Sequence, residues 1–278
     1  YSQKVQKFFR RASVVEDITN TDYAGEIENF GDTVKIIKEP VVSVQAYTRG
    51  SVVNPQNLAD DQITLVVDQA SAFAFKVDDI EERHSHVNFE SVATSSGAYA
   101  LKNSYDQNVL TNLFSGAGTT IGSDGSGQDV GFGSSEVDPL NLLANHGKRL
   151  NASDIPFENR WFIGSPAFYE QLQQTDSKLL DTRFSGDASG VLRNGKVYEG
   201  NIGGFMLYMS NNLPASSTSN YEKVMSGHMS AASTANHIAK IEVVRDPDSF
   251  ADVVRGLHVF GRKVLRSDAL IAEHILVD

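Results

Sequence analysis

Residues 31–79 contain two segments in which apolar and polar side chains alternate, a pattern typical of half-buried β-strands. The alternating apolar positions are Val34, Ile36, Val42, Val44 and Ala46 on the outbound segment and Ile63, Leu65, Val67, Phe73, Phe75 and Val77 on the return segment. The polar stretch between them, from Arg49 to Asp61, has the composition of a turn. Two arms of about 15 residues, at about 3.3 Å per residue, would form a ribbon about 50 Å long. Because an isolated ribbon is barely stable, we expect it to lie on a neighbouring subunit; a hairpin packed inside its own domain is the alternative.

The composition is that of an ordinary globular protein, and it excludes several function classes. The 278 residues, 40% hydrophobic and 21% charged, suffice for one large domain or two smaller ones. A net charge of −11 argues against a dedicated nucleic-acid binder, but not against a protein that encloses nucleic acid. Without cysteine, the sequence allows no disulfide, iron–sulfur cluster or thiol catalysis. Its apolar runs are too short for a transmembrane span or signal peptide, and the start at Tyr1 leads us to expect that upstream residues were removed.

The first 30 residues are expected to form an N-terminal arm that crosses to the ribbon. Residues 1–12 mix basic side chains with Phe8 and Phe9, in a spacing that permits one or two amphipathic helical turns. Residues 17–28 show no period and are expected to be extended. The sequence suggests no partner for Phe8 and Phe9 within the chain, so we expect them to dock on another chain.

Beyond the ribbon, the pattern predicts one long helix and then a mixture of helices and strands. Carboxylates in residues 78–82 favour the positive end of a helix, and helical spacing of apolar residues continues from Phe89 to about Phe114. The glycine-rich residues 116–133 indicate a flexible loop. Further expected elements are a helix opened by Asp138-Pro139, a strand at 160–164, a helix opened by Ser165-Pro166, a hairpin at Asn194-Gly195, a strand at 202–209, a long surface loop at 215–236, and strands at 238–244 and 253–264.

This order of elements resembles that of the major capsid (coat) proteins of tailed bacteriophages, which have the Hong Kong 97-type fold. The sequence blocks that carry the resemblance are residues 31–36 at the entry to the ribbon, 67–69 and 73–79 at its exit, 160–166, 202–205 and 210–214 in the axial domain, and 250–264 in the closing strands. The resemblance spans nearly the whole chain and is looser at residues 116–133 and 215–236.

The resemblance implies an α+β fold in four parts. These are an N-terminal arm (1–30), an extended β-ribbon loop (31–79), a peripheral domain with a spine helix (80–158 and 237–278) and an axial domain (159–236). It implies a non-enzymatic structural protein that self-assembles, as pentamers and hexamers, into an icosahedral shell around double-stranded DNA without sequence-specific binding.

The same resemblance implies portal, scaffolding and decoration proteins as partners, no membrane, and a place in the virion, with the host cytoplasm as the site of assembly. A cargo-enclosing nanocompartment shell of the encapsulin type is the runner-up within the same fold. An α+β hydrolase or sugar-binding protein is the alternative from another class.

No catalytic residue, cofactor or metal site is predicted. The glycines at 116, 118 and 122 do not fit a dinucleotide-binding or phosphate-binding loop, and no Gly-x-Ser-x-Gly motif is found. His84 and His86 are two residues apart, and on a helix they point away from each other. Some coat proteins of this fold form a covalent crosslink through a loop lysine. Because no lysine lies between Ala46 and Phe75, we expect no such crosslink here.

We expect contacts with neighbouring subunits at the aromatic residues of the arm, at the tip of the ribbon, and at a glycine pair in the predicted strand 202–209. Glycines inside a strand mark a bulge or a close approach of the backbone. The residues are Phe8, Phe9, Arg49, Asn54, Pro55, Gly203 and Gly204.

Overall fold

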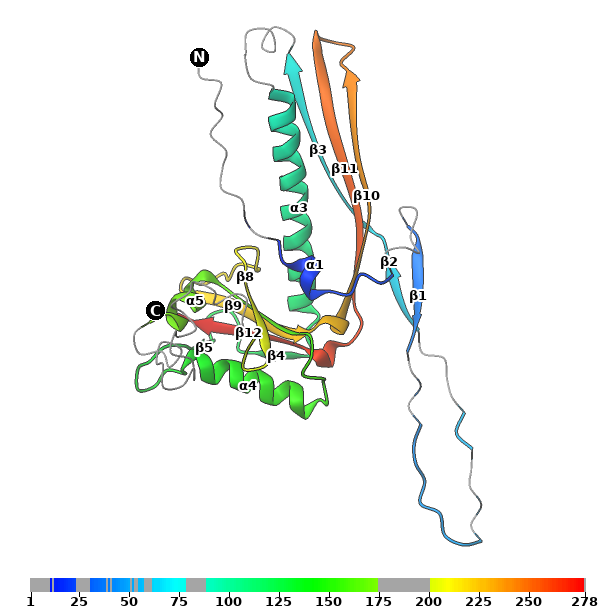
Figure 1. Ribbon diagram of the computed structural model, residues 1–278, viewed down its shortest axis with the longest axis vertical. Helices are drawn as coiled ribbons and strands as arrows, with labels where there is room; N and C mark the ends of the chain where they lie inside the picture. Colours follow the sequence, from blue (N-terminus) through cyan, green and yellow to red (C-terminus); the bar gives the residue numbers. More distant parts are fainter. Residues whose placement is uncertain are drawn as a thin grey trace.

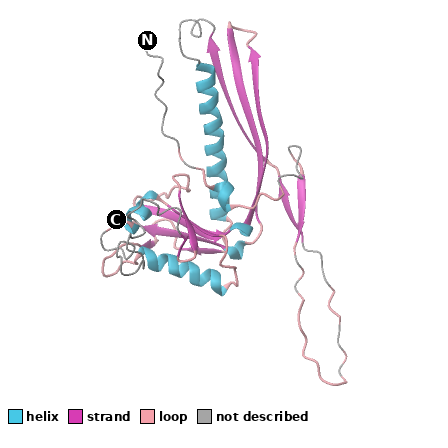
Figure 2. Ribbon diagram, in the orientation of Figure 1, coloured by secondary structure: helices cyan, strands magenta, loops and turns pink. Residues whose placement is uncertain are grey.

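The computed structural model describes residues 11, 13–23, 31–38, 40, 42–50, 52, 55–57, 62–78, 89–174 and 201–277. A three-stranded sheet with a long helix beside it rises from a second body built on a seven-stranded sheet, and a long loop hangs away from both (Figure 1). The second body mixes helices and strands, whereas the elongated part consists of one helix and three long strands (Figure 2).

The elements have the following bounds. The helices are α1 (Val15–Ile18), α3 (Phe89–Ser115), α4 (Pro139–Ala152) and α5 (Pro166–Leu172), with 3-10 turns η3 (Met229–Ala231) and η4 (Ser267–Ala269). The strands are β1 (Thr33–Ile37), β2 (Gln62–Val66), β3 (Gln69–Asp78), β4 (Thr119–Ile121), β5 (Gln128–Asp129), β6 (Arg160–Gly164), β7 (Asn201–Ile202), β8 (Phe205–Met209), β9 (Tyr221–His228), β10 (Ala232–Arg245), β11 (Ala251–Val264) and β12 (Leu270–Leu276).

The paired part of the predicted ribbon is much shorter than the sequence pattern indicated. β1 and β2 pair antiparallel only from Thr33 opposite Val66 to Ile37 opposite Gln62. Residues 42–48 alternate as a strand would, yet they belong to no strand. The return arm divides as well, because β3 pairs along its whole length with β11. The prediction of two long paired arms was therefore wrong: half of the return arm has its strand partner near the other end of the chain.

The long helix α3 lies along one face of the antiparallel sheet β10–β11–β3 (Figure 1). It begins at Phe89 and ends at Ser115, which confirms the predicted helix. Asp78, expected at the start of this helix, is instead the last residue of β3. Asp79, His84 and His86 lie outside the described residues.

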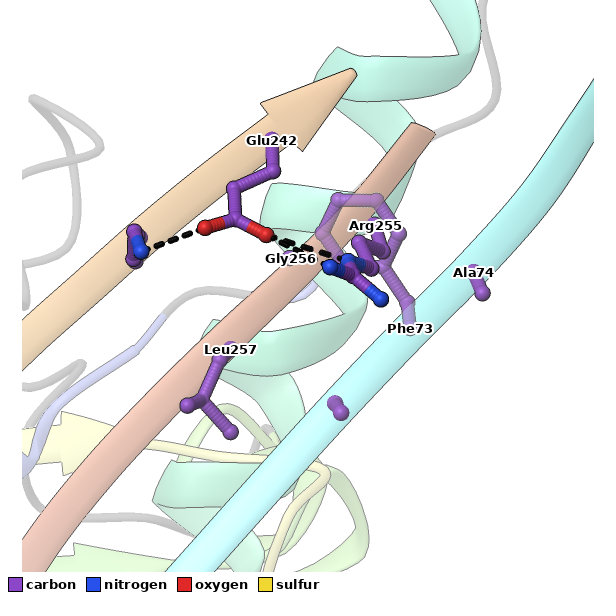
Figure 3. Close-up of a pocket in the computed structure, with 8 residues that line it drawn as sticks. Phe73, Ala74, Glu242, Arg255, Gly256 and Leu257 are labelled. Carbon is purple, nitrogen blue, oxygen red and sulfur yellow. Dashed lines mark hydrogen bonds and ion pairs between the residues drawn. The ribbon is translucent and has the colours of Figure 1, made fainter. Parts of the chain in front are cut away.

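Two glycines let α3 and the sheet approach each other closely. Gly256 of β11 stands directly opposite Phe73 of β3, and the Phe73 ring covers the space that a side chain at 256 would occupy (Figure 3). On the helix, a Cβ at Gly97 would lie 2.7 Å from the same ring. The ring of Phe73 therefore fills the joint between helix and sheet, and both glycines are needed because real Cβ atoms do not approach so near.

Replacing Gly256 by alanine should destabilise the subunit by about 1–3 kcal/mol, since the added methyl overlaps the Phe73 ring. Chemical denaturation of the unassembled subunit measures the effect. Gly256→Ala should cost less in a Phe73→Leu background, because the smaller side chain leaves room. Equal costs in both backgrounds would contradict this account of the joint.

The seven-stranded sheet has the order β4–β12–β9–β6–β8–β7, with β5 pairing to the end of β12. Helices α4 and α5 cover one of its faces and close an apolar cluster. Its members include Leu142, Leu143, Leu150, Phe162, Phe168, Leu172, Phe205 and Leu207.

The predicted starts of α4 and α5 are confirmed: the Asp138 carboxylate accepts a hydrogen bond from the Leu140 N–H at 2.8 Å, and the Ser165 hydroxyl accepts one from the Phe168 N–H at 3.3 Å.

Three segments of this sheet were assigned wrongly from the sequence. Residues 215–236, expected to be a surface loop, contain the central strand β9 and the first part of β10. Residues 116–133, expected to be a loop, contain β4 and β5. Residues 202–209 are not one strand, because a turn at Gly203-Gly204 separates β7 from β8. Small polar residues misled the prediction: β9 lies between β12 and β6, and those neighbours decide its conformation despite its composition.

The sheets do not follow the predicted domain boundaries. β12 and β4 come from segments assigned to the peripheral domain, yet both belong to the sheet that contains β6, β8 and β9 of the predicted axial domain. The division of the chain into domains stays a prediction.

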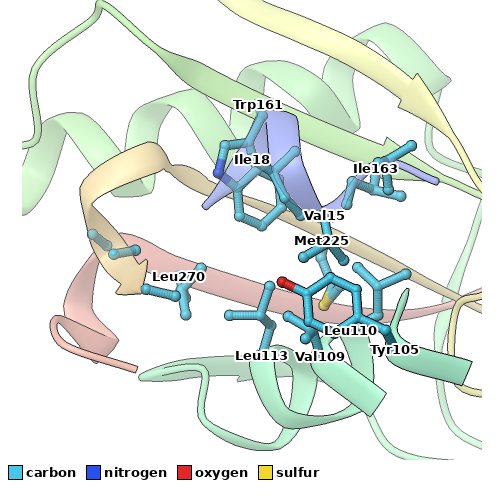
Figure 4. Close-up of a cluster of buried hydrophobic side chains, with 14 of the residues drawn as sticks. Val15, Ile18, Tyr105, Val109, Leu110, Leu113, Trp161, Ile163, Met225 and Leu270 are labelled. Carbon is cyan, nitrogen blue, oxygen red and sulfur yellow. The ribbon is translucent and has the colours of Figure 1, made fainter. Parts of the chain in front are cut away.

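The other face of the seven-stranded sheet packs on α1 and the lower part of α3, where the largest apolar cluster lies (Figure 4). Trp161 of β6 is 1% exposed, as expected of a core residue. Val15 and Ile18 of α1 are 0% and 1% exposed and belong to the same cluster. Residues 14–18 are thus part of the subunit core, and the assignment of residues 1–30 to an N-terminal arm stays a prediction. Phe8 and Phe9 lie outside the described residues.

A single buried carboxylate fixes this N-terminal segment. Asp106 of α3 is 0% exposed, and its Oδ1 accepts hydrogen bonds from the Ser13 hydroxyl at 2.9 Å and from the N–H groups of Val14 and Val15 at 3.2 Å each. Its Oδ2 accepts a hydrogen bond from the Asn212 side-chain amide at 2.9 Å. The carboxylate therefore caps α1 from a different element and joins it to the segment that follows β8.

Asp106→Ala should lower the free energy of unfolding of the subunit by about 2–4 kcal/mol, because it leaves buried N–H donors without an acceptor. Asp106→Asn, which keeps one carbonyl oxygen toward α1, should lose distinctly less. Both values come from denaturant titration of the unassembled protein. A loss below about 1 kcal/mol for the alanine variant would show that the cap is dispensable.

Candidate functional site

A serine, a histidine and a glutamate form a hydrogen-bonded chain in the seven-stranded body. The His146 Nδ1 lies 2.6 Å from the Ser226 Oγ, and the His146 Nε2 lies 2.6 Å from the Glu273 Oε2. A hydrolase would need the serine hydroxyl at a surface that substrate can reach. Ser226 and His146 are each 0% exposed and Glu273 is 4% exposed. The chain links α4 to β9 and β12, so its role is structural. Sequence inspection missed it because the three residues are far apart and form no motif.

Other signs of a chemical site are absent from the described residues. Among them, no three metal-ligating side chains gather closely enough to hold an ion. No described helix combines the length and the apolar character needed to cross a membrane. The features that remain are surfaces: an exposed loop, an open sheet face and a hairpin tip.

The loop between β1 and β2 presents large apolar side chains to solvent. Val42, Val44, Tyr47 and Val52 are 67%, 97%, 66% and 85% exposed. Isolated exposed apolar residues are ordinary, but several on one extended segment mark an interaction site. The turn at Arg49-Gly50 is exposed, with Gly50 in the left-handed region at φ 88°.

The loop is tied across its width and held firmly at its base. The backbone N–H and the hydroxyl of Ser43 both donate to the Gln56 Oε1 at 3.0 Å. At the base, Val34 and Leu65 pack on Val259 of β11, and all three are at most 7% exposed. This packing directs the loop away from the rest of the subunit (Figure 1).

The sheet face opposite α3 is open above the β1–β2 hairpin. A hollow of about 480 Å³ lies there, with Ala72 and Ala74 on β3 and Leu257 on β11 among the side chains that line it (Figure 3). At its rim, Glu242 accepts hydrogen bonds from the Arg255 guanidinium at 2.9 and 3.1 Å and pairs with Lys240. These contacts hold the pKa of the Glu242 carboxyl below its usual range, by hydrogen bonding first and charge attraction second.

The third surface surrounds the hairpin turn between β7 and β8. Gly203 and Gly204 have φ of 62° and 89°, and two positive φ values are characteristic of a tight type I′ turn. Next to the turn, Phe157 is 67% exposed and carries the Arg160 guanidinium 4.4 Å from its ring centre. A Cβ at Gly204 would have only the Phe157 ring near it, at 4.0 Å. The sequence suggested a bulge or a close approach of the backbone at these glycines. Within the chain, they instead form the turn between β7 and β8.

Gly204→Val should destabilise the subunit by about 1–2 kcal/mol through backbone strain, since a β-branched residue resists positive φ. Gly204→Asn, which tolerates this region, is the matched control and should cost clearly less. Thermal unfolding of the unassembled protein compares the two. If valine and asparagine behave alike, the turn does not require its positive φ.

The structure describes four of the seven residues predicted to contact neighbours. Arg49 and Pro55 are exposed on the loop, and Gly203 and Gly204 form the tip of the β7–β8 hairpin. Asn54 lies outside the described residues, as do the two aromatic residues of the arm. For all seven, contact with another subunit stays a prediction. The exposed Phe157 was not predicted, because an aromatic residue in a loop gives no sign of its exposure.

Comparison with solved structures identifies the fold. A chain from Mycobacterium phage Che8 superposes with a TM-score of 0.83 at 27% identity, over 98% of this chain and 94% of that one. The capsid structure of the Cyanophage P-SCSP1u matches with a TM-score of 0.74 at 17% identity, over 99% and 91% of the two chains. This chain has the fold of a phage capsid protein. A capsid chain of the empty GTA particle matches as well, with a TM-score of 0.69, 11% identity and coverage of 99% and 94%.

These matches confirm the α+β class and the capsid fold that the sequence resembles. No protein-family model and no curated protein sequence matches the chain. The capsid fold therefore rests on the arrangement of the whole chain, including the long loop, rather than on a short motif.

Proposed function

We propose that this chain is the major capsid protein of a tailed bacteriophage. Many copies form the pentamers and hexamers of an icosahedral shell that encloses double-stranded DNA in the virion. The observation that carries the proposal is the end-to-end match to phage capsid chains, which covers nearly all of this chain and at least nine-tenths of the matched chains.

The shape of the subunit supports this role. A body with two fused sheets supplies the wall, while the loop extends apolar side chains beyond it, where only another chain can bury them. Each contact between subunits can be weak, because a closed shell repeats it many times and the contacts act together.

The net charge of the chain favours a shell that encloses DNA over a protein that binds DNA directly. At a net charge of −11, the wall repels phosphate groups overall, so the DNA is contained without sequence-specific binding. Assembly takes place in the host cytoplasm, and portal, scaffolding and decoration proteins are the proposed partners of the shell.

The alternatives are less well supported. An encapsulin-type compartment would enclose protein cargo, whereas the structures that this chain matches are those of phages and of phage and GTA particle capsids. A hydrolase or a sugar-binding protein would need an accessible site, and the Ser226–His146–Glu273 chain is buried.

Expression of the full chain should yield closed particles that sediment far ahead of the monomer and appear as round shells by negative-stain microscopy.

Replacing residues 48–60 by Asn-Gly should leave the subunit folded, since its core lies elsewhere, but should lower the fraction of protein in shells at least several-fold. The triple variant Val42→Ser, Val44→Ser, Tyr47→Ser keeps the length of the loop but removes its apolar side chains. Comparison with the shortened protein therefore separates the effect of lost apolar contacts from the effect of a shorter loop. Heat-stable, full-size shells from the shortened protein would show that the loop does not join subunits.

A further inference from the structure

The outer edge of β10 is a long strand edge with one neighbour. In the described part of the chain, β10 pairs with β11 along its length, and its other side carries only a single bridge, from Asn20 to Ser233 at the start of the strand. Residues 240–244 therefore have N–H and C=O groups directed away from the sheet with no strand to receive them. Such an edge is a template for pairing with another strand.

The same edge exposes apolar side chains. Ile241 and Val243 stand opposite Gly256 and Val254 in the ladder, on the face that α3 covers. Val254 is 1% exposed, but Ile241 and Val243 are 50% and 54% exposed, because the helix does not reach the edge strand. A further strand beside β10 would bury them.

The charges of this edge are already paired within the sheet. Glu242 binds both Lys240 and Arg255 (Figure 3). The Arg245 Nη1 lies 3.1 Å from the Asp252 Oδ1. Exposed pairs of this kind add little stability. Lys240 and Arg255 share the one Glu242 carboxylate, so this group keeps one net positive charge, and an uncharged segment beside it meets no charge repulsion.

The chain itself contains a segment that matches this edge. Residues 42–48 are uncharged, and Val42, Val44 and Ala46 alternate with polar residues as in a strand, yet the segment forms no strand in its own subunit. Val44 is 97% exposed. The loop points away from the upper end of β10 (Figure 1), so the segment cannot lie beside residues 240–244 of the same chain.

We propose that residues 42–48 of one copy pair with residues 240–244 of a second copy and extend its sheet to four strands. This inference rests on the proposed shell, which places many copies side by side. Main-chain hydrogen bonds supply the attraction, as in other cases of strand addition. Val42 and Val44 pack against Ile241 and Val243, since residues opposite each other on one face of a sheet are in contact.

Engineered cysteines test the pairing, because the natural sequence contains none. Val44→Cys is combined with Ile241→Cys or with Val243→Cys, since either residue could stand opposite Val44. Directly opposed residues lie about 4.5–5.5 Å apart between Cα atoms, which suits a disulfide. Mild oxidation of assembled particles should give covalent multimers on a non-reducing gel for at least one pair. Val44→Cys with Ala74→Cys, on the opposite edge strand β3, is the matched control and should stay monomeric.

Two further variants separate strand pairing from simple proximity. Val44→Pro removes a backbone donor and interrupts a ladder, so it should lower shell yield severalfold; Val44→Thr, which suits a strand, should not. Shells that form normally but show no crosslink at either β10 position, or that crosslink at Ala74 instead, would overturn the inference and leave the proposed function intact. Failure of the unmodified chain to form any shell would overturn the proposed function, and this inference with it.

Discussion

The Asp106 carboxylate is the contact on which the arrangement of the subunit depends. It sits on α3, which belongs to the elongated sheet part, and it binds both α1 and the Asn212 side chain next to the seven-stranded sheet. A buried carboxylate is costly unless several donors surround it, and here the donors come from two distant parts of the sequence, residues 13–15 and Asn212. Satisfying one anion thus fixes three elements at once, and the cluster around Trp161 closes over them.

A second constraint works on the same helix further up. Phe73 can lie between Gly97 and Gly256 only if neither has a side chain, so the distance from α3 to the sheet is set by one aromatic ring. Together, the ring and the carboxylate hold the long helix at two points, Gly97 and Asp106. The exposed loop and sheet edge are thereby presented from a rigid frame, which reduces the entropy cost of joining subunits.

Local signals in the sequence were enough to predict some elements and not others. The long helix, the strand at Arg160 and the helices at Pro139 and Pro166 were predicted correctly, because caps and helical periodicity act over a few residues. The strands β9 and β4 were missed, since their conformation comes from partners distant in sequence. Residues 42–48 failed in the opposite way: their pattern is that of a strand, but in the described part of the chain they belong to no strand. Of the candidate surfaces, the loop was foreseeable from its pattern, whereas the exposure of Phe157 and of the β10 edge depends on what α3 and the turns leave uncovered.

Only Val67 and Asp68 separate β2 at the base of the loop from β3 in the sheet, and Val67 is fully buried. The link between β2 and β3 is therefore too short to act as a hinge. If the loop docks on a neighbouring subunit as proposed, tension on it would pass along β3 and load its ladder with β11, from Gln69 to Asp78, in shear. The hydrogen bonds of that ladder would then resist this tension together instead of breaking one after another. In the proposed shell, the short link after β2 would thus make the sheet of each subunit carry the tension between neighbouring subunits.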